Sequence, residues 1–218
     1  MKNVHVSGNQ TTPRILRIAC ATVFAVALTV ALPQPAHADP VTPPPVPVNI
    51  QPPAGTETFL EGHAIGTQAY ICMEAGSSFV WTFFGPQATL FNEGFRQVIT
   101  HFLSPNPLEF GTPRATWQHS RDTSGVWGRA IASSSDPAFV APGAIPWLLL
   151  EVIGAAEGPT RGHTLTSTTF IQRLNTVGGV PPATGCSQST DVGKRALVPY
   201  EADYFFYQNR KSDDGTGN

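Results

Sequence analysis

Residues 66–86, GTQAYICMEAGSSFVWTFFGP, have the pattern of two β-strands joined by a tight turn. In residues 66–73, side chains alternate between two faces and include β-branched and aromatic types, which is typical of a strand covered on both sides. Residues 79–84 are apolar on both faces apart from one threonine, so we expect them at the centre of a sandwich or closed barrel. Gly76-Ser77-Ser78 supplies the reversal, and Gly85-Pro86 is expected to end the second strand because proline cannot continue a hydrogen-bonded ladder.

Shorter runs of the same character fill much of the remaining chain. Clusters of glycine, proline, serine or asparagine separate them at intervals found in antiparallel all-β folds. The runs cover residues 88–91, 97–102, 114–119, 126–132, 147–153, 166–174 and 197–207. With the opening pair they predict an all-β fold, an antiparallel sandwich or barrel of about nine strands in a single domain. Pairing of the first strand with the last run would close the sheet and bring the chain ends together near the disulfide expected below. The last run has Tyr200, Ala202, Tyr204 and Phe206 on one apolar face and acidic residues on the other, which predicts a half-exposed strand.

The first 38 residues have the features of a secretory signal peptide. Arg14 and Arg17 precede a nearly uninterrupted apolar run, residues 18–32, and the small-x-small triplet Ala36-His37-Ala38 follows. Cleavage is therefore expected after Ala38, and the apolar run is too short to span a bilayer comfortably. We predict an exported protein, periplasmic or extracellular, with no membrane span after cleavage.

The predicted organisation has four parts. Residues 1–38 form the signal peptide, and residues 39–58 are rich enough in proline to predict an extended linker. Residues 59–207 form the all-β domain. Residues 208–218 are polar and are expected to be a disordered tail.

The charge of the chain argues against nucleic acid and anionic lipid as partners. The sequence has 13 basic and 15 acidic residues, and cleavage would remove three basic residues, which leaves a formal charge of −5. A protein with this balance lacks the basic surface that binds polyanions.

Cys72 and Cys186 are the two cysteines that remain once Cys20 is removed with the leader. An even pair in an oxidising compartment predicts a disulfide. Two separate buried thiols are the alternative. A redox-active pair is disfavoured because the Cys-x-x-Cys spacing does not occur in the sequence.

No sequence pattern predicts a catalytic or metal centre. The chain without its leader keeps four histidines: His63, His101, His119 and His163. None of them shows the pairwise spacing that marks a zinc site, and the Gly-x-Ser-x-Gly elbow is missing too. His101, Asp122 and Ser124 stay open as a triad, since triads are recognised by geometry and not by spacing. We therefore assign no catalytic residue, metal or cofactor.

The richest polar and aromatic stretch is residues 114–129, RATWQHSRDTSGVWGR. Its two indole rings stand beside polar side chains, an arrangement that a carbohydrate or small ligand would use. The candidate binding residues are His101, Trp117, Gln118, Asp122 and Trp127. The alternative is that both tryptophans are core residues of adjacent strands, with residues 122–125 as an ordinary hairpin turn.

A series of motifs, in order along the chain, resembles a known family. The matching segments are GTQAYICM (66–73), VWTFFGPQATLF (80–91), His101, ATW (115–117), AIPWLLL (144–150), FIQRLNTVGGVPP (170–182), Gly185-Cys186 and VPYEADYFFY (198–207). They cover about residues 60–207 and are similar to a family of secreted bacterial and fungal proteins described as a domain of unknown function, DUF3455. The resemblance implies an exported single-domain protein without an established activity.

Two departures from the family pattern concern the candidate site. Where members have a histidine followed closely by Gly-Pro-Thr-Trp, this chain inserts residues 103–114 between His101 and Trp117. Where they have an acidic residue after that tryptophan, this chain has Gln118. If the family's site lies there, its acid is missing here, which argues against a carboxylate-dependent enzyme.

These observations predict a non-catalytic extracytoplasmic binding or interaction module that uses the surface around His101, Trp117 and Asp122. The alternative is a secreted hydrolase or metal-assisted enzyme with its site at the same residues. A third hypothesis is a stable envelope or matrix protein without a small-molecule site. The expected partners are a carbohydrate, a small ligand or another envelope protein.

Overall fold

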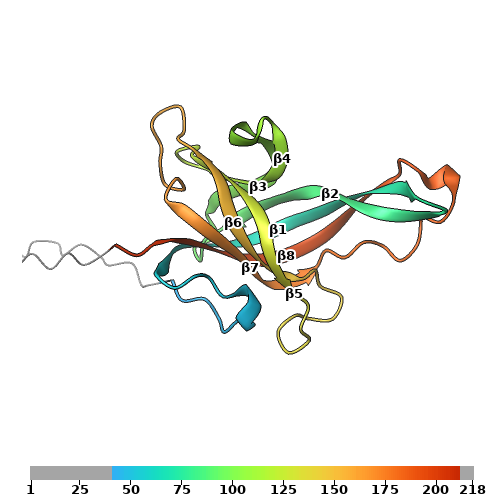
Figure 1. Ribbon diagram of the computed structural model, residues 1–218, viewed down its shortest axis with the longest axis horizontal. Coiled ribbons are helices and arrows are strands. Elements are labelled where there is room, and N and C mark those ends of the chain that lie inside the picture. Colours follow the sequence, from blue (N-terminus) through green and yellow to red (C-terminus); the bar gives the residue numbers. More distant parts are fainter. Residues whose placement is uncertain (1–40, 212–218) are drawn as a thin grey trace, which may run out of the picture. The chain divides into compact units, whose positions relative to one another are not determined.

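Eight antiparallel strands form a closed barrel in which each strand pairs with the next and β8 returns to β1 (Figure 1). The computed structural model describes residues 41–211, so the expected signal peptide lies outside the described residues. The strands are β1 (Thr56–Ala75), β2 (Ser78–Phe91), β3 (Gln97–Asn106), β4 (Thr112–His119), β5 (Gly125–Ser134), β6 (Trp147–Ala156), β7 (Thr168–Gly178) and β8 (Arg195–Asn209). Across residues 41–211, no helix has the length and apolar character needed to cross a membrane. The prediction of an antiparallel all-β fold is confirmed.

The ladder between β1 and β8 closes the barrel and confirms the predicted pairing of the first strand with the last. It runs from Thr56 opposite Asn209 to Ile71 opposite Arg195. Gly66 lies within this ladder, where an added Cβ would lie 2.1 Å from the carbonyl oxygen of Gln87 on β2. Glycine is therefore required for the close approach of β1 to β2.

The hairpin of β1 and β2 differs from the expected one. The pairing of β2 with β3 begins only at Gln87, so the preceding part of β2 pairs with β1 alone. Phe83 and Phe84 are consequently 52% and 50% exposed, and the prediction that residues 79–84 form a buried central strand is wrong. Gly85-Pro86 does not end the strand, because both residues continue the ladder to β1, after a β-bulge and just before the pairing with β3 begins. Two predicted runs are thus one strand, β2.

Apolar side chains pack on both faces of the sheet around β6, β7 and β8. The cluster inside the barrel includes Leu90, Ile99, Leu150, Ile171 and Phe206. A second cluster includes Ile50, Trp147, Leu149, Leu174 and Phe205. Leu149 and Leu150, like Phe205 and Phe206, are neighbours in sequence that belong to different clusters, as the alternation of a strand requires. The C-terminal part of β8 is therefore covered on both faces, and the prediction of a half-exposed last strand is wrong for that part.

The second cluster involves the segment that precedes β1. Ile50 ends a short 3-10 helix, η1 (Val48–Ile50), and its side chain is 0% exposed. The buried Gln172 on β7 donates a 2.7 Å hydrogen bond from Nε2 to the carbonyl oxygen of Ile50. The range 39–58, expected as a linker, thus contains core residues and the beginning of β1. At the other end, β8 continues to Asn209, and residues 212–218 of the expected tail lie outside the described residues.

The predicted disulfide between Cys72 and Cys186 is present, with a Cα–Cα distance of 5.5 Å. Cys72 is buried near the end of the β1–β8 ladder, and Cys186 belongs to the connection between β7 and β8. The same connection is held to β1 by backbone hydrogen bonds, from Cys72 N to the oxygen of Lys194 and from Gly193 N to the oxygen of Cys72. The bridge therefore fastens a long loop to the far end of the hairpin. The expectation that the pairing brings the ends together near the bridge is wrong for the ends of the barrel, because β1 begins and β8 ends at the opposite end of the ladder, at Thr56 and Asn209.

Removing the bridge by Cys72→Ala with Cys186→Ala is expected to lower the free energy of unfolding by about 4 to 5 kcal/mol. The two cysteines are 114 residues apart, and the cross-link restricts the unfolded chain correspondingly. Urea denaturation of the double variant and of oxidised wild type measures the difference, and wild type treated with a thiol reductant is the control. Equal denaturation midpoints for all three would contradict the prediction.

Candidate functional site

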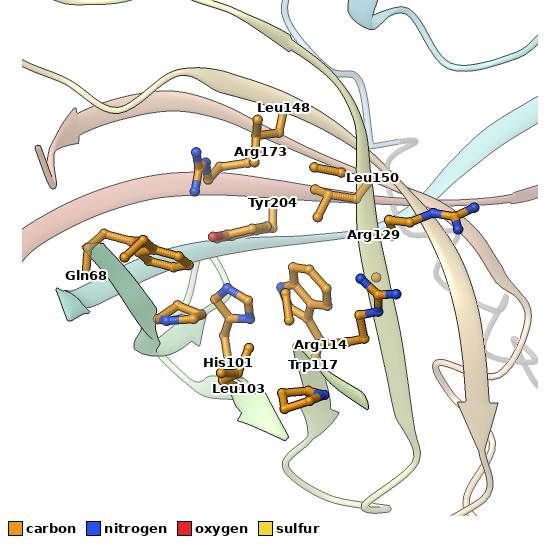
Figure 2. A pocket seen from close by; sticks show the side chains of 16 residues that line it. Gln68, His101, Leu103, Arg114, Trp117, Arg129, Leu148, Leu150, Arg173 and Tyr204 are labelled. Carbon is orange, nitrogen blue, oxygen red and sulfur yellow. The ribbon is translucent and has the colours of Figure 1, made fainter. Parts of the chain in front are cut away.

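A cavity of about 360 Å³ opens within the barrel, and all eight strands contribute side chains to its wall (Figure 2). The polar and aromatic lining residues include Gln68, His101, Arg114, Trp117, Arg129, Arg173 and Tyr204. An eight-stranded barrel has an interior wide enough for either packed side chains or one small ligand. The apolar cluster fills part of this interior, and the cavity occupies another part.

Two stacked aromatic rings and a third that is inclined to both form one wall of the cavity. His101 on β3 lies directly opposite Trp117 on β4, and their rings are parallel within 14° with centroids 4.3 Å apart. Tyr204 on β8 contacts both rings, at 5.1 Å from His101 and 5.7 Å from Trp117. Gly128 on β5 leaves room for the indole, because a Cβ there would lie 2.8 Å from Cζ3 of Trp117. The position of Trp117 therefore depends on glycine at residue 128.

His101 is held in one tautomer. Its Nδ1 lies 2.8 Å from the carbonyl oxygen of Thr116, so Nδ1 carries the proton and donates it. Burial lowers the pKa of His101 to about 3, and the charge of Arg173 lowers it as well. The imidazole is therefore neutral at physiological pH, and Nε2 is left as a hydrogen-bond acceptor.

Three buried donors in the wall of the cavity have no hydrogen-bond partner within residues 41–211. They are Nε2 of Gln68, Nε1 of Trp117 and Nε of Arg173. Gln68 is 2% exposed and Trp117 is 1% exposed, so bulk water does not satisfy these groups. A buried donor without a partner costs about 1 to 3 kcal/mol. Such groups are rare in native structures, and their gathering in one cavity requires an explanation.

The cavity wall contains arginine but no aspartate or glutamate. Two of its three arginines have carboxylate partners nearby: Arg114 pairs with Glu109 at 2.8 Å, and Arg129 pairs with Glu151 at 2.8 Å. Arg173 donates from Nη2 to the carbonyl oxygen of Pro146 and has no ion-pair partner among the described residues. The cavity is therefore positive, and the uncompensated charge is that of Arg173.

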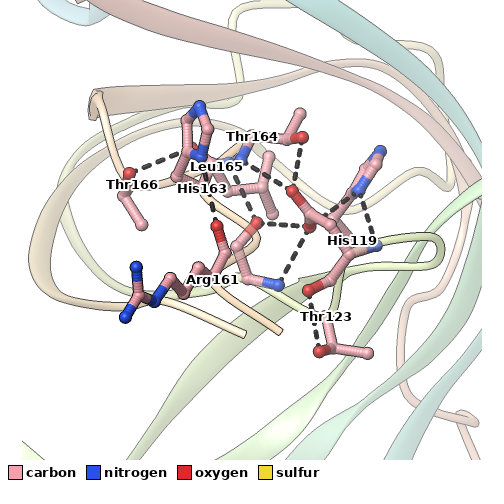
Figure 3. A network of polar contacts seen from close by, with 9 residues as sticks. His119, Thr123, Arg161, His163, Thr164, Leu165 and Thr166 are labelled. Carbon is pink, nitrogen blue, oxygen red and sulfur yellow. Dashed lines mark hydrogen bonds and ion pairs between the residues drawn. The ribbon is translucent and has the colours of Figure 1, made fainter. Parts of the chain in front are cut away.

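Asp122, another predicted binding residue, lies outside the cavity wall in a network of its own (Figure 3). Its carboxylate accepts hydrogen bonds from the backbone N–H and hydroxyl of Ser124, and from the same two groups of Thr164. Partial burial acts to raise the pKa of Asp122, but these bonds hold it well below its usual range. The residue ties the β4–β5 turn to the connection between β6 and β7.

The same network differs from the triad of His101, Asp122 and Ser124 that the sequence left open. His119, and not His101, approaches Asp122, with Nδ1 2.9 Å from Oδ1, and Ser124 Oγ donates to that same oxygen at 2.7 Å. The acid therefore lies between serine and histidine, whereas a catalytic triad places the histidine in the middle. Ser124 is also fully buried.

The five predicted binding residues thus divide between three places. His101 and Trp117 lie together in the cavity wall, and Asp122 is in the loop network. Gln118 is exposed, and half-buried Trp127 donates from Nε1 to Ser104 Oγ at 2.9 Å. The last two, on β4 and β5, do not line the cavity.

Five polar residues of the cavity wall were not among the predicted binding residues: Gln68, Arg114, Arg129, Arg173 and Tyr204. Arg114 and Arg129 lie within the polar and aromatic stretch 114–129 that the sequence singled out. Gln68, Arg173 and Tyr204 each belong to strands whose neighbours are largely apolar. A single polar side chain on the inward face of such a strand is the signal that could have found the first two. For Tyr204 the alternation of β8 correctly predicted a buried position, and nothing in the sequence distinguished a cavity from packed core.

One group of side chains could hold a metal ion. Glu61, His63 and Glu93 bring one ligand atom each within 4.8 Å of one another. The Nδ1 atom of His63 is 2.7 Å from Oδ1 of Asp203, which orients the ring. Glu93 is largely exposed, and exposed acidic groups of this kind are common without a metal, so we assign no function to the group.

The chain belongs to a family whose model carries the description "Protein of unknown function (DUF3455)" and matches residues 53–208. The match spans the whole cavity wall and confirms the resemblance of the motifs. A search of curated proteins and a search of solved structures each returned no match. The family description states no activity, so the function has to be inferred from the cavity itself.

Acid should destabilise the protein partly through His101. The unfolded state binds a proton near pH 6.5, whereas the buried imidazole binds one only near pH 3, so between these values the unfolded state holds more protons. The contribution of neutral His101 to the free energy of unfolding is therefore fully present above about pH 6.5. It decreases as the pH is lowered from there, by up to ~1.4 kcal/mol per pH unit. His101→Phe keeps a ring against Trp117 and should reduce this slope in urea denaturation between pH 4 and 7. A slope equal to that of the wild type would contradict the assignment.

Asp122→Asn should lower the free energy of unfolding by about 2 to 4 kcal/mol, because the new amide nitrogen cannot accept the bonds that the carboxylate accepts. Asp136→Asn is the matched control, since Asp136 accepts one backbone bond in an exposed turn and an asparagine oxygen can replace it. Thermal and urea unfolding of both variants measure the effect. If the two substitutions cost the same, the network around Asp122 does not hold the loops together.

Proposed function

We propose that the protein is an exported binding module that takes a small ligand into the cavity of its barrel. The observation that carries this proposal is the set of three buried donors, on Gln68, Trp117 and Arg173, that face one cavity without partners within the described chain. Native proteins satisfy nearly all buried donors with protein groups or ordered water. A ligand with acceptor atoms would satisfy these three together, and the neutral His101 adds one acceptor.

Export is supported by the leader-like residues 1–38 and by the disulfide. A bridge of this kind persists in oxidising compartments and is rare in the cytosol. The bond also fits a binding role, because it fastens the β7–β8 connection and so limits movement at one end of the barrel. A preorganised site loses less conformational entropy when it binds.

The hydrolase alternative has weaker support. General acid–base chemistry needs a group whose pKa lies near the working pH, and His101 is far below that range. The cavity wall offers no carboxylate, and the serine, histidine and aspartate that do meet are arranged with the acid in the middle. Binding therefore accounts for the geometry with fewer assumptions.

The proposal is tested by thermal unfolding of the protein without its leader against a panel of sugars, small acids and their neutral analogues. A ligand at 100 times its dissociation constant stabilises by about 2.7 kcal/mol, which corresponds to roughly 5 to 10 °C for a domain of this size. Gly128→Ala should abolish the shift, because the added Cβ would displace the indole of Trp117 into the cavity.

Trp127→Phe is the matched control, since its ring lies outside the cavity wall and the shift should persist. The same panel, analysed for product formation, tests the hydrolase alternative. Turnover that requires His101 would replace the binding proposal. A shift that survives Gly128→Ala would place the ligand elsewhere, and the absence of any shift would remove the support for a small-molecule site.

A further inference from the structure

The charge balance of the cavity leads beyond binding in general to a class of ligand. We propose that the cavity binds a small organic monocarboxylate, with its carboxylate at Arg173 and its body against the apolar part of the wall. This inference rests on the proposed function and adds the chemical identity of the ligand's polar end.

Arg173 is the first reason. A guanidinium inside a protein is normally paired with a carboxylate, because an unpaired buried charge is costly. Arg173 is partly buried, and its Nη2 donates to a backbone carbonyl oxygen, which does not neutralise the positive charge. Its Nε has no partner in the described part of the chain. A planar guanidinium presents its donors in a fork that matches the two oxygens of a carboxylate.

The other unpartnered groups are of the same chemical kind. All three unpartnered atoms, Gln68 Nε2, Trp117 Nε1 and Arg173 Nε, are hydrogen-bond donors. The cavity is therefore suited to a ligand with hydrogen-bond acceptor atoms. Figure 2 shows Arg173 and the hydroxyl end of Tyr204 on the Gln68 side of the cavity, with Arg114 and Arg129 on the other side. Burial lowers the pKa of His101 and raises the pKa of Tyr204. The positive charge of Arg173 acts to lower the pKa of both residues, so the field of Arg173 extends into the cavity.

A monocarboxylate fits better than a phosphate or sulfate. The two remaining arginines of the wall are already neutralised by Glu109 and Glu151, which leaves one free positive charge. A dianion would keep an uncompensated negative charge in the cavity. The rest of the wall includes Phe83, Leu148 and Leu150, against which an apolar body would pack.

The test is calorimetric titration of the purified wild-type protein with matched pairs that differ only in charge: cinnamate and cinnamamide, phenylacetate and phenylacetamide, hexanoate and hexanamide. We expect at least one acid to bind at least tenfold more tightly than its amide. Inorganic phosphate and sulfate are separate arms and should bind more weakly than that acid. This comparison needs no variant, so it does not depend on whether a substitution folds.

Arg173→Gln should weaken binding of the preferred acid 10- to 100-fold and leave the amide unchanged, as expected for the loss of a charge-assisted bond. Arg173→Lys keeps the charge but not the fork and should recover part of the affinity. Arg121→Gln removes the same charge from an exposed turn and should change nothing. Thermal unfolding confirms that each variant is folded.

The outcomes separate this inference from the proposed function. Suppose a neutral sugar or amide binds as tightly as the acids and no longer binds to the Gly128→Ala variant. That result would support the proposed binding function and overturn the inference that the ligand is a carboxylate. Tighter binding of phosphate or sulfate would overturn it too. Failure of every acid and every neutral compound to bind would overturn both proposals.

Discussion

The antiparallel ladder between β1 and β8 is the constraint on which the rest of the structure depends. Without it the eight strands would form an open sheet with two unpaired edges and no interior. Closure creates an enclosed space that is larger than the available apolar side chains fill, so a cavity remains beside the packed cluster. The local choices follow from this geometry. Glycine at residue 66 lets β1 and β2 approach, and glycine at residue 128 leaves space for the indole of Trp117.

The cavity is where stability and function oppose each other. Donors on Gln68, Trp117 and Arg173 would be more favourably replaced by apolar groups if folding were the only requirement. Outside the cavity, one further buried donor among residues 41–211, Nε1 of Trp147, is without a partner. Other polar groups there are bonded: the carboxylate of Asp122 joins two loops, and Gln172 holds the segment before β1. Sites that break local rules in an otherwise consistent structure are where function is expected.

Much of the fold could be predicted because alternation and turn residues are local signals. The closing strand pair was inferred from the same patterns, and the disulfide from an even pair of cysteines behind a leader sequence. The exposed Phe83 and Phe84 could not be predicted, since an apolar strand is buried only if a neighbour covers it, and β3 pairs with β2 only from Gln87 onward. The buried position of Ile50 was not predicted, because the surrounding sequence is rich in proline and indicates an extended linker. For the site, His101 and Trp117 were both candidate binding residues, but their stacking was not predicted. Arg173 is recognisable as a lone polar side chain on an inward face, but whether that position faces the cavity depends on barrel register, which no single strand encodes.

The position of the bridge has a consequence for how the ends of the domain can open. Thr56 pairs with Asn209, and Arg210 N donates to the carbonyl oxygen of Gly55, so β1 begins beside the end of β8. Cys72 and Cys186 lie at the far end of the same ladder. Hydrogen bonds alone close the first end of the ladder, whereas a covalent bond secures the loop at the other end. Fraying at Thr56 and Asn209 would therefore leave the connection between β7 and β8 in place.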